Sequence, residues 1–139
     1  MTENATTISN YFGYRDASAA IDWLGRAFGF ETTMRFDVED GSVGHSELRL
    51  GDAAIVVFTD QEGYERPPRK GETYGFGTYL TLPDEAQVDK IHAQAVDAGA
   101  TTVWKPELTE WGNYRCRVLD LEGFEWTFGT HRPGQPAEW

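Results

Sequence analysis

The stretch YRDASAAIDWLGRAFGF, from Tyr14 to Phe30, decides the fold. Its small and apolar residues recur at the spacing that places them on one face of an α-helix, and they are Ala17, Ala20, Ile21, Leu24 and Phe28. Asp16 stands where a side-chain oxygen caps the start of this helix, and Gly29 stands where a left-handed residue ends it. Because the apolar face needs a sheet to cover it, the stretch predicts a strand, a helix and a strand in succession.

A second stretch of the chain repeats this pattern. Thr78–Leu82 has the composition of a strand, and Asp84 stands where it would cap a helix whose apolar stripe ends at Gly99. Gly99 lies 70 residues after Gly29, and Asp84 lies 68 residues after Asp16. A self-similarity at this spacing predicts two copies of one structural module.

The two copies define the expected organisation of the chain. After each helix the sequence predicts three strands, so that each module has the order β-α-β-β-β. In the second module these include a strand over 101–105, followed by a loop over 106–113. We therefore expect one α+β domain over 1–139. It consists of a first module at 8–59, a polar linker at 60–75, a second module at 76–130 and a tail at 131–139.

Composition excludes several classes of function. Lys and Arg number 12 against 23 Asp and Glu, a formal net charge of −11, so a nucleic-acid backbone would be repelled. Arg66, Arg69 and Lys70 cluster beside two prolines, which indicates a solvated linker and not a binding face. Cys116 is the one cysteine and points to a reducing compartment. Since no stretch has the pattern of a membrane span or a signal peptide, we expect a cytoplasmic protein with no membrane or nucleic-acid partner.

Aromatic residues supply the main functional signal. Of the five tryptophans, three fall on a predicted strand end, a loop and the tail instead of in obvious core positions: Trp104, Trp111 and Trp139. The strand faces turned away from the helices carry further rings at Tyr11, Phe58 and Tyr79. These rings predict a stacking site for a flat molecule or, alternatively, a filled dimer interface. With Glu47 and the negative net charge, such a site would favour a neutral or cationic ligand through cation–π and Coulomb attraction.

Short motifs are spread along both halves of the chain. They are AIDWL at 20–24, RAFGFE at 26–31, GHSELRLG at 44–51, AGA at 98–100, WG at 111–112, DLEGFEW at 120–126 and FGT at 128–130. In these motifs the chain resembles the vicinal oxygen chelate superfamily, which includes glyoxalase I, extradiol dioxygenases and bleomycin-resistance proteins. The resemblance runs from Ile8 to Pro133. It implies that two tandem βαβββ modules form a cupped mixed sheet, and that the protein is a homodimer.

The resemblance also bears on metal binding. Metal-dependent members of this family place His, Gln or Glu ligands on four strands, and the matching positions here are Ser9, Val56, Gly77 (or Thr78) and Thr127. Val and Gly have no donor atom, and Ser and Thr hydroxyls are weak ligands for first-row metal ions. We therefore expect no metal and no cofactor, and no glyoxalase I or dioxygenase chemistry of the metal-dependent kind.

The remaining candidates for chemistry are His45 and Glu47, which share the outward face of one predicted strand. The leading hypothesis is metal-free binding of a small planar or cationic molecule in a cleft between the modules. The expected ligand-binding residues are Tyr11, His45, Glu47, Phe58, Tyr79, Trp104, Trp111 and Arg115. The alternative is a metal-independent lyase or isomerase in which Glu47 or His45 acts as acid or base. A third hypothesis is a regulatory protein with no ligand of its own.

Overall fold

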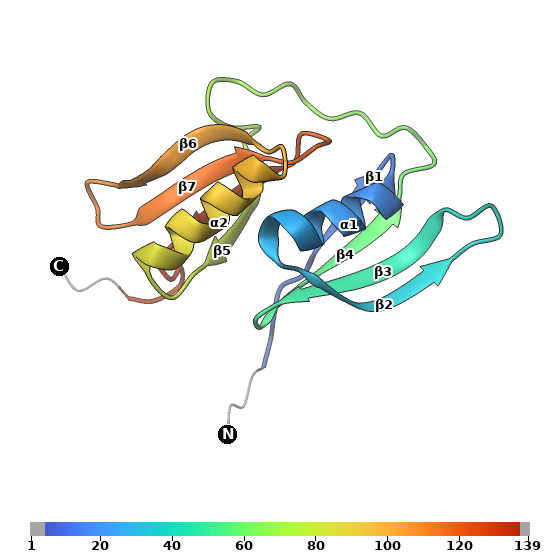
Figure 1. Ribbon diagram of the computed structural model, residues 1–139, viewed down its shortest axis with the longest axis horizontal. Coiled ribbons are helices and arrows are strands. Elements are labelled where there is room, and N and C mark those ends of the chain that lie inside the picture. Colours follow the sequence, from blue (N-terminus) through green and yellow to red (C-terminus); the bar gives the residue numbers. More distant parts are fainter. Residues whose placement is uncertain (1–4, 137–139) are drawn as a thin grey trace. The chain divides into compact units, whose positions relative to one another are not determined.

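The computed structural model describes residues 5–136 and divides into two compact units (Figure 1). The first unit comprises residues 5–25 and 29–64, and the second comprises residues 26–28 and 65–136. Trp139, which the sequence places in the tail, lies outside the described residues. Within residues 5–136, neither helix has the length and hydrophobicity needed to span a lipid bilayer.

The first unit contains a four-stranded mixed sheet. In chain order the elements are β1 (Asn10–Tyr14), α1 (Ala17–Phe28), β2 (Glu31–Asp37), β3 (Val43–Leu50) and β4 (Ala53–Thr59). β1 pairs in parallel with β4, whereas β4 pairs with β3 and β3 with β2 in antiparallel fashion. The strands therefore lie in the order β1-β4-β3-β2, as Figure 1 shows.

The second unit repeats this arrangement. Its elements are β5 (Thr78–Thr81), α2 (Glu85–Asp97), β6 (Thr101–Leu108), β7 (Tyr114–Leu119) and β8 (Glu125–Gly129). β5 pairs in parallel with β8, and the antiparallel pairs β8–β7 and β7–β6 complete a sheet of order β5-β8-β7-β6. α2 packs on β6, β7 and β8. The same order and directions in both sheets confirm the predicted α+β fold of two βαβββ modules.

The predicted aspartates cap the N-termini of both helices. Asp16 Oδ1 accepts a hydrogen bond from the backbone N–H of Ala19 at 3.0 Å, and Asp84 Oδ1 accepts one from that of Gln87 at 2.9 Å. Each bond satisfies a backbone donor that has no partner inside its helix. At the other end of α1, Gly29 has φ of 90°, a conformation that glycine adopts without steric cost. The helix limits were therefore readable from local sequence.

Strand β6 departs from the prediction. It continues through Pro106 to Leu108, whereas the sequence predicted that it ends at Lys105. β6 forms the edge of its sheet, and its pairing with β7 shifts register between Trp104 and Glu107. A proline is tolerated there because an irregular edge strand does not need its missing N–H. Trp104 consequently lies within the strand and not at its end.

Large apolar side chains fill the interior of the second unit. Trp126 and Phe128 on β8 are 0% and 1% exposed, and the centre of the Phe28 ring lies 5.1 and 4.9 Å from the centres of their rings. Cys116 on β7 is also fully buried, and this burial raises the pKa of its thiol to about 12. Cys116 is therefore a packing residue and not a nucleophile.

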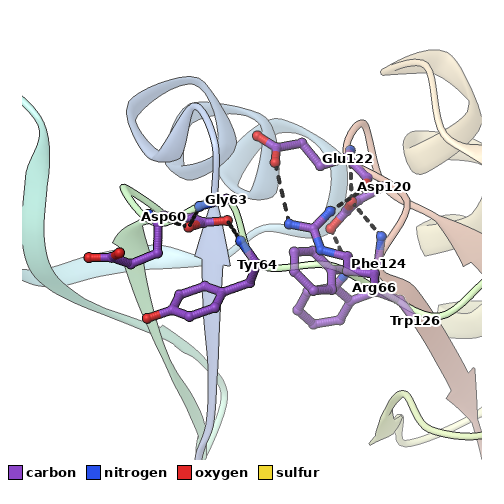
Figure 2. A network of polar contacts seen from close by, with 9 residues as sticks. Asp60, Gly63, Tyr64, Arg66, Asp120, Glu122, Phe124 and Trp126 are labelled. Atoms are coloured by element: carbon purple, nitrogen blue, oxygen red, sulfur yellow. Dashed lines mark hydrogen bonds and ion pairs between the residues drawn. The ribbon is translucent and has the colours of Figure 1, made fainter.

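Asp120 organises the turn between β7 and β8. It accepts hydrogen bonds from the backbone N–H groups of Glu122 and Phe124, both at 3.0 Å, and from Trp126 Nε1 at 2.9 Å (Figure 2). The guanidinium of Arg66 lies 4.0 Å from the centre of the Phe124 ring and donates a hydrogen bond to the Glu122 carbonyl oxygen at 2.8 Å. Stacking and hydrogen bonding therefore hold Arg66 on this turn, whereas Arg69 and Lys70 of the same cluster are exposed, as expected for a solvated segment.

Asp60 organises a turn at the end of the first unit. Its carboxylate accepts hydrogen bonds from the backbone N–H groups of Glu62, Gly63 and Tyr64 at 2.9, 2.8 and 3.0 Å (Figure 2). Burial alone would raise the pKa of Asp60, but these donors and the positive charge of Arg15 outweigh it, so the pKa of Asp60 lies below its ordinary value. The turn is therefore built around an ionised carboxylate.

The lowered pKa predicts an acid-sensitive contribution to stability. In the unfolded chain Asp60 takes up its proton near its ordinary value of 3.8, whereas the folded state resists protonation. The ionised carboxylate therefore stabilises the fold above about pH 4, and this contribution is lost as the pH falls through the lower pKa of the folded state. We expect the urea midpoint of Asp60→Asn to lie below that of the wild type near neutral pH, with a gap that shrinks below about pH 4.

The matched control for this prediction is Asp52→Asn, which removes an exposed carboxyl in the turn between β3 and β4. Its midpoint should follow that of the wild type across the whole range. A gap between wild type and Asp60→Asn that stays constant with pH would show that the Asp60 charge does not matter.

Candidate functional site

A pocket on the second sheet contains four of the predicted ligand-binding residues. It has a volume of about 350 Å³. Arg115 and Arg117 alternate on β7 with the buried Cys116 and Val118, so the pocket lies on the face of the sheet that points away from the core. Its lining residues are Tyr79, Trp104, Thr109, Trp111, Asn113, Arg115, Arg117, Thr127, His131 and Pro133.

One wall of the pocket is a tryptophan stacked with two arginines. Trp104 on β6 pairs with Arg117 on β7 in the strand register. The guanidinium carbons of Arg117 and Arg115 lie 3.7 and 4.1 Å from the centre of the Trp104 ring. At these distances each cation is attracted by the electron-rich face of the indole, which also shields the guanidinium groups from water. The β6–β7 pairing therefore places two positive charges at the pocket.

Arg117 is held by several partners. Its Nε donates a hydrogen bond to Thr127 Oγ1 at 2.8 Å, and its Nη1 donates one to the Glu72 carbonyl oxygen at 2.9 Å. Nε also lies 3.6 Å from a carboxylate oxygen of Glu125, whose side chain is only 4% exposed. Burial lowers the pKa of Arg117, and the charges of Glu125 and Glu72 oppose this effect. Arg117 is thus a fixed, partly neutralised cation.

Arg115 is bound far less firmly. Its Nη1 lies 3.4 Å from Glu107 Oε1, a carboxylate on a side chain that is 52% exposed. The Arg115 side chain itself is only 14% exposed. A guanidinium carries five N–H donors in one plane, so this single long contact leaves most of its donor capacity unused. Arg115 is therefore a shielded cation that can still accept an anionic partner.

The opposite wall is a small polar network. Tyr79 Oη donates a hydrogen bond to the His131 carbonyl oxygen at 2.8 Å and lies 3.4 Å from Asn113 Oδ1. Asn113 Oδ1 also accepts a hydrogen bond from the His131 N–H at 3.0 Å. Burial raises the pKa of Tyr79, so its hydroxyl remains protonated at neutral pH. The network orients a phenol and an amide at the pocket.

Gly129 on β8 makes room for this network. A Cβ atom at this position would lie 2.6 Å from Asn113 Oδ1 and would overlap the Tyr79 hydroxyl. The backbone of Gly129 does not have a positive φ, so steric space and not backbone conformation requires glycine there. The arrangement of Tyr79 and Asn113 therefore requires glycine at position 129.

Trp111 borders the pocket from the loop before β7. Its side chain is 57% exposed, and its ring meets the His131 ring edge-on at a distance of 5.1 Å between centres and an angle of 83°. An exposed indole beside a pocket offers a stacking surface to a flat ligand.

The other predicted ligand-binding residues belong to the first unit. His45 Nε2 lies 2.8 Å from Glu47 Oε2, and both side chains are about half exposed. Tyr11 is 76% exposed, and its ring lies 6.4 Å from that of Phe58. Phe58 lines a second, smaller pocket of about 260 Å³, which also includes Tyr64. The structure therefore places the eight predicted residues in two groups, one in each unit.

Sequence reasoning missed part of the pocket in the second unit. Arg117 shares the outward face of β7 with the predicted Arg115, so strand alternation along β7 could have identified it. Asn113 and His131 lie outside regular strands, on a loop and in the tail, and no local pattern identified them. Their role follows from contacts between segments that are distant in sequence.

The four positions that match the metal ligands of the family do not supply a set of metal-coordinating atoms. Val56 has no donor atom, and Ser9 is an exposed residue before β1. The hydroxyl of Thr127 already accepts a hydrogen bond from Arg117. At Gly77 a Cβ atom would lie 2.7 Å from a carboxylate oxygen of Glu125, so a ligating side chain has no room there. These residues do not fit a first-row metal ion.

Within residues 5–136, no group of three or more His, Cys, Asp or Glu side chains is arranged to hold a metal ion.

Comparisons with known proteins agree with this fold. The sequence profile of the Glyoxalase/Bleomycin resistance protein/Dioxygenase superfamily matches residues 11–128. The uncharacterized protein Mb0911c of Mycobacterium bovis is 30% identical over 118 residues, which cover 82% of this chain and 76% of that protein. The crystal structure of TioX from Micromonospora sp. ML1 is similar at 29% identity, with a TM-score of 0.69 and coverage of 91% of this chain and 100% of TioX.

A more distant structure shares the fold. It is a glyoxalase/bleomycin resistance protein/dioxygenase family enzyme from Burkholderia phytofirmans PsJN, with 20% identity, a TM-score of 0.62 and coverage of 87% of this chain and 95% of that enzyme. The profile match spans most of the chain and both βαβββ modules. The chain belongs to the glyoxalase/bleomycin resistance protein/dioxygenase superfamily.

Proposed function

We propose that this protein binds a small planar molecule, without a metal ion, in the pocket of the second unit. The observation that carries the proposal is the pocket of about 350 Å³, in which two indoles meet a few oriented polar groups. Small-molecule sites in proteins are typically concave and combine aromatic surface with a small number of fixed donors and acceptors. Trp104 and Trp111 supply the aromatic surface here, and Tyr79 and Asn113 supply the polar groups.

The metal-free part of the proposal is supported by the donor chemistry of the family's ligand positions. Two of them have no donor atom, and the Thr127 hydroxyl is already engaged with Arg117. We expect purified protein to retain no stoichiometric zinc, nickel or iron after dialysis in elemental analysis. Tight binding of any of these ions, with a change in probe affinity when it is removed, would contradict the proposal.

Trp111→Ala tests whether the pocket binds planar molecules. We expect calorimetric titration with a panel of planar compounds to give saturable binding to the wild type, weakened roughly twofold to tenfold in Trp111→Ala because a stacking partner is lost. Trp111 is 57% exposed, so the substitution should leave the fold intact.

The matched control is Tyr64→Ala, which removes an equally exposed ring from the smaller pocket of the first unit. Its affinity for the same compounds should equal that of the wild type. If Tyr64→Ala weakens binding and Trp111→Ala does not, the site lies in the first unit. If no planar compound binds, the proposed function is wrong.

The second candidate function is a metal-independent lyase or isomerase that uses His45 or Glu47. The observation in its favour is the 2.8 Å contact between His45 Nε2 and Glu47 Oε2, because a carboxylate can orient an imidazole for proton transfer. Activity lost in Glu47→Gln with ligand binding unchanged would support it. The pair ranks second because both side chains are about half exposed and neither lines a pocket described above.

We also propose that the protein forms a homodimer, which the resemblance to the family implies. Apolar side chains at Tyr11, Met34 and Phe36 are between 46% and 76% exposed in the first unit, and such surface is typical of a contact region. Light scattering should give twice the mass of the 15.6 kDa chain. A mass of 15.6 kDa at all protein concentrations would contradict this proposal.

A further inference from the structure

We infer that the pocket of the second unit selects planar aromatic carboxylates, with Arg115 as the residue that anchors the carboxylate. The inference rests on the proposed function and adds the chemical class of the ligand. It reverses the expectation of a neutral or cationic ligand, which was drawn from Glu47 and from the net charge of the whole chain.

The charged residues that line the pocket differ in sign from the net charge of the chain. The chain has a formal net charge of −11, yet the residues that line the pocket include Arg115 and Arg117 and no Asp or Glu. At physiological ionic strength, charges separated by more than about 8 Å are largely screened. The charges that a ligand inside the pocket meets are therefore the nearby ones. Arg117 is neutralised by the buried carboxylate of Glu125 at 3.6 Å, whereas Arg115 contacts only the exposed carboxylate of Glu107 at 3.4 Å. A ligand carboxylate that displaces Glu107 would take Arg115 as its cationic partner.

The two arginines are not equivalent. Arg117 is engaged by Thr127, by the Glu72 carbonyl and by the buried carboxylate of Glu125, so it has little capacity left for a ligand. Arg115 has one long contact, to the exposed Glu107. A carboxylate that forms two parallel hydrogen bonds with Arg115 would replace this weak surface pair by a stronger, shielded one.

The stack on Trp104 fits a ligand that is flat as well as anionic. The Arg115 guanidinium lies 4.1 Å from the centre of the Trp104 ring, so the indole keeps the cation in place and shields it from water. A guanidinium meets a carboxylate best when both groups lie in one plane. An aromatic carboxylate is itself planar and can stack on the exposed ring of Trp111.

Asn113 supplies a second donor for the same ligand. Its Oδ1 accepts the hydrogen bond from the backbone N–H of His131, and this fixes the orientation of the amide because a backbone N–H can only donate. The Nδ2 group is then the free donor of the amide, since no described residue accepts a hydrogen bond from it. Arg115 and Asn113 Nδ2 together offer N–H donors and no acceptor to the ligand.

The test compares three planar probes of nearly equal shape. Naphthoate is ionised at neutral pH, naphthamide is neutral and naphthylmethylammonium is cationic, all substituted at the same ring position. In calorimetric titration of the wild type we expect naphthoate to bind roughly tenfold or more tightly than naphthamide, and the ammonium probe to bind most weakly. In Arg115→Gln the affinities for naphthoate and naphthamide should become nearly equal.

Arg49→Gln is the matched control, because it removes the same charge from an exposed side chain of the first unit. It should keep the wild-type preference for naphthoate. If Arg115→Gln does not fold, the salt dependence of the wild type decides instead. Raising the salt concentration should then weaken naphthoate binding and leave naphthamide binding unchanged.

The outcomes separate this inference from the proposed function. Equal binding of naphthoate and naphthamide, tighter binding of the ammonium probe, or a preference that survives in Arg115→Gln would overturn the anion selectivity and leave the planar-ligand function standing. Failure of all three probes to bind would overturn both.

Discussion

Replacing Trp126 by alanine is expected to lower the free energy of unfolding by about 3–5 kcal/mol, the typical cost of truncating a large buried aromatic side chain. Trp126 lies on β8 with no solvent exposure, and its ring packs on that of Phe28. Its Nε1 donates a hydrogen bond to Asp120 Oδ2 at 2.9 Å. The substitution therefore opens a cavity in the core and removes a buried donor from the turn between β7 and β8. Urea denaturation followed by far-ultraviolet circular dichroism measures the loss.

Two further variants show where this loss originates. Trp111→Ala makes the same chemical change at a side chain that is 57% exposed, and should cost little stability. Trp126→Phe keeps most of the ring volume but leaves Asp120 Oδ2 without its indole partner, at a cost of about 1–3 kcal/mol. If Trp126→Ala unfolds at the same urea concentration as Trp111→Ala, the described core of the second unit is wrong.

Replacing Gly129 by alanine is expected to disable the pocket. The added methyl group would lie 2.6 Å from Asn113 Oδ1 and would overlap the Tyr79 hydroxyl, so both side chains must move. Overpacking of this kind costs about 1–3 kcal/mol of stability. The affinity for naphthamide should fall by roughly tenfold or more, because the oriented phenol and amide no longer meet the ligand. Calorimetric titration and urea denaturation of the same preparation measure both effects.

Gly13→Ala is the matched control for this prediction. A Cβ atom at Gly13 would lie 3.0 Å from a ring carbon of Phe58, so it disturbs the first unit and leaves the pocket of the second unit untouched. It should reduce stability without reducing naphthamide affinity. In the double variant Gly129→Ala/Tyr79→Phe, removal of the overlapping hydroxyl should restore part of the stability. Wild-type affinity in Gly129→Ala would show that the Tyr79 and Asn113 network is not part of the site.

The sequence predicted those parts of the fold that depend on neighbours along the chain. Asp16 and Asp84 cap their helices as expected, and Gly29 ends the first helix, because caps and left-handed glycines act within a few residues. The repeat of this signal identified two modules with the same strand order. Strand β6 was predicted too short because the tolerance for Pro106 depends on the strand lying at the edge of its sheet, which sequence alone does not show.

The candidate site was predictable only in part. Strand alternation placed Tyr79 on an outward face, and the structure brings it into one pocket with Arg115, which was also among the expected ligand-binding residues. Asn113 and His131 reach that pocket through contacts between a loop, the tail and β5, and such contacts leave no periodic pattern. The expected charge of the ligand was taken from Glu47, which lies in the first unit, and from the net charge of the whole chain. The charge that a ligand meets, however, depends on the residues nearest to it. Here these are Arg115 and Arg117 and the carboxylates of Glu107 and Glu125 that contact them.

The reactivity of Cys116 with alkylating reagents can be used to measure local unfolding of the second unit. Cys116 is the one thiol in the chain, it has no solvent exposure on β7, and burial raises its pKa to about 12, so an alkylating reagent cannot react with the native form. Modification therefore requires β7 to separate from its neighbours. The alkylation rate, followed by mass spectrometry with and without a bound compound, would report how strongly the ligand suppresses this local unfolding, without any engineered label.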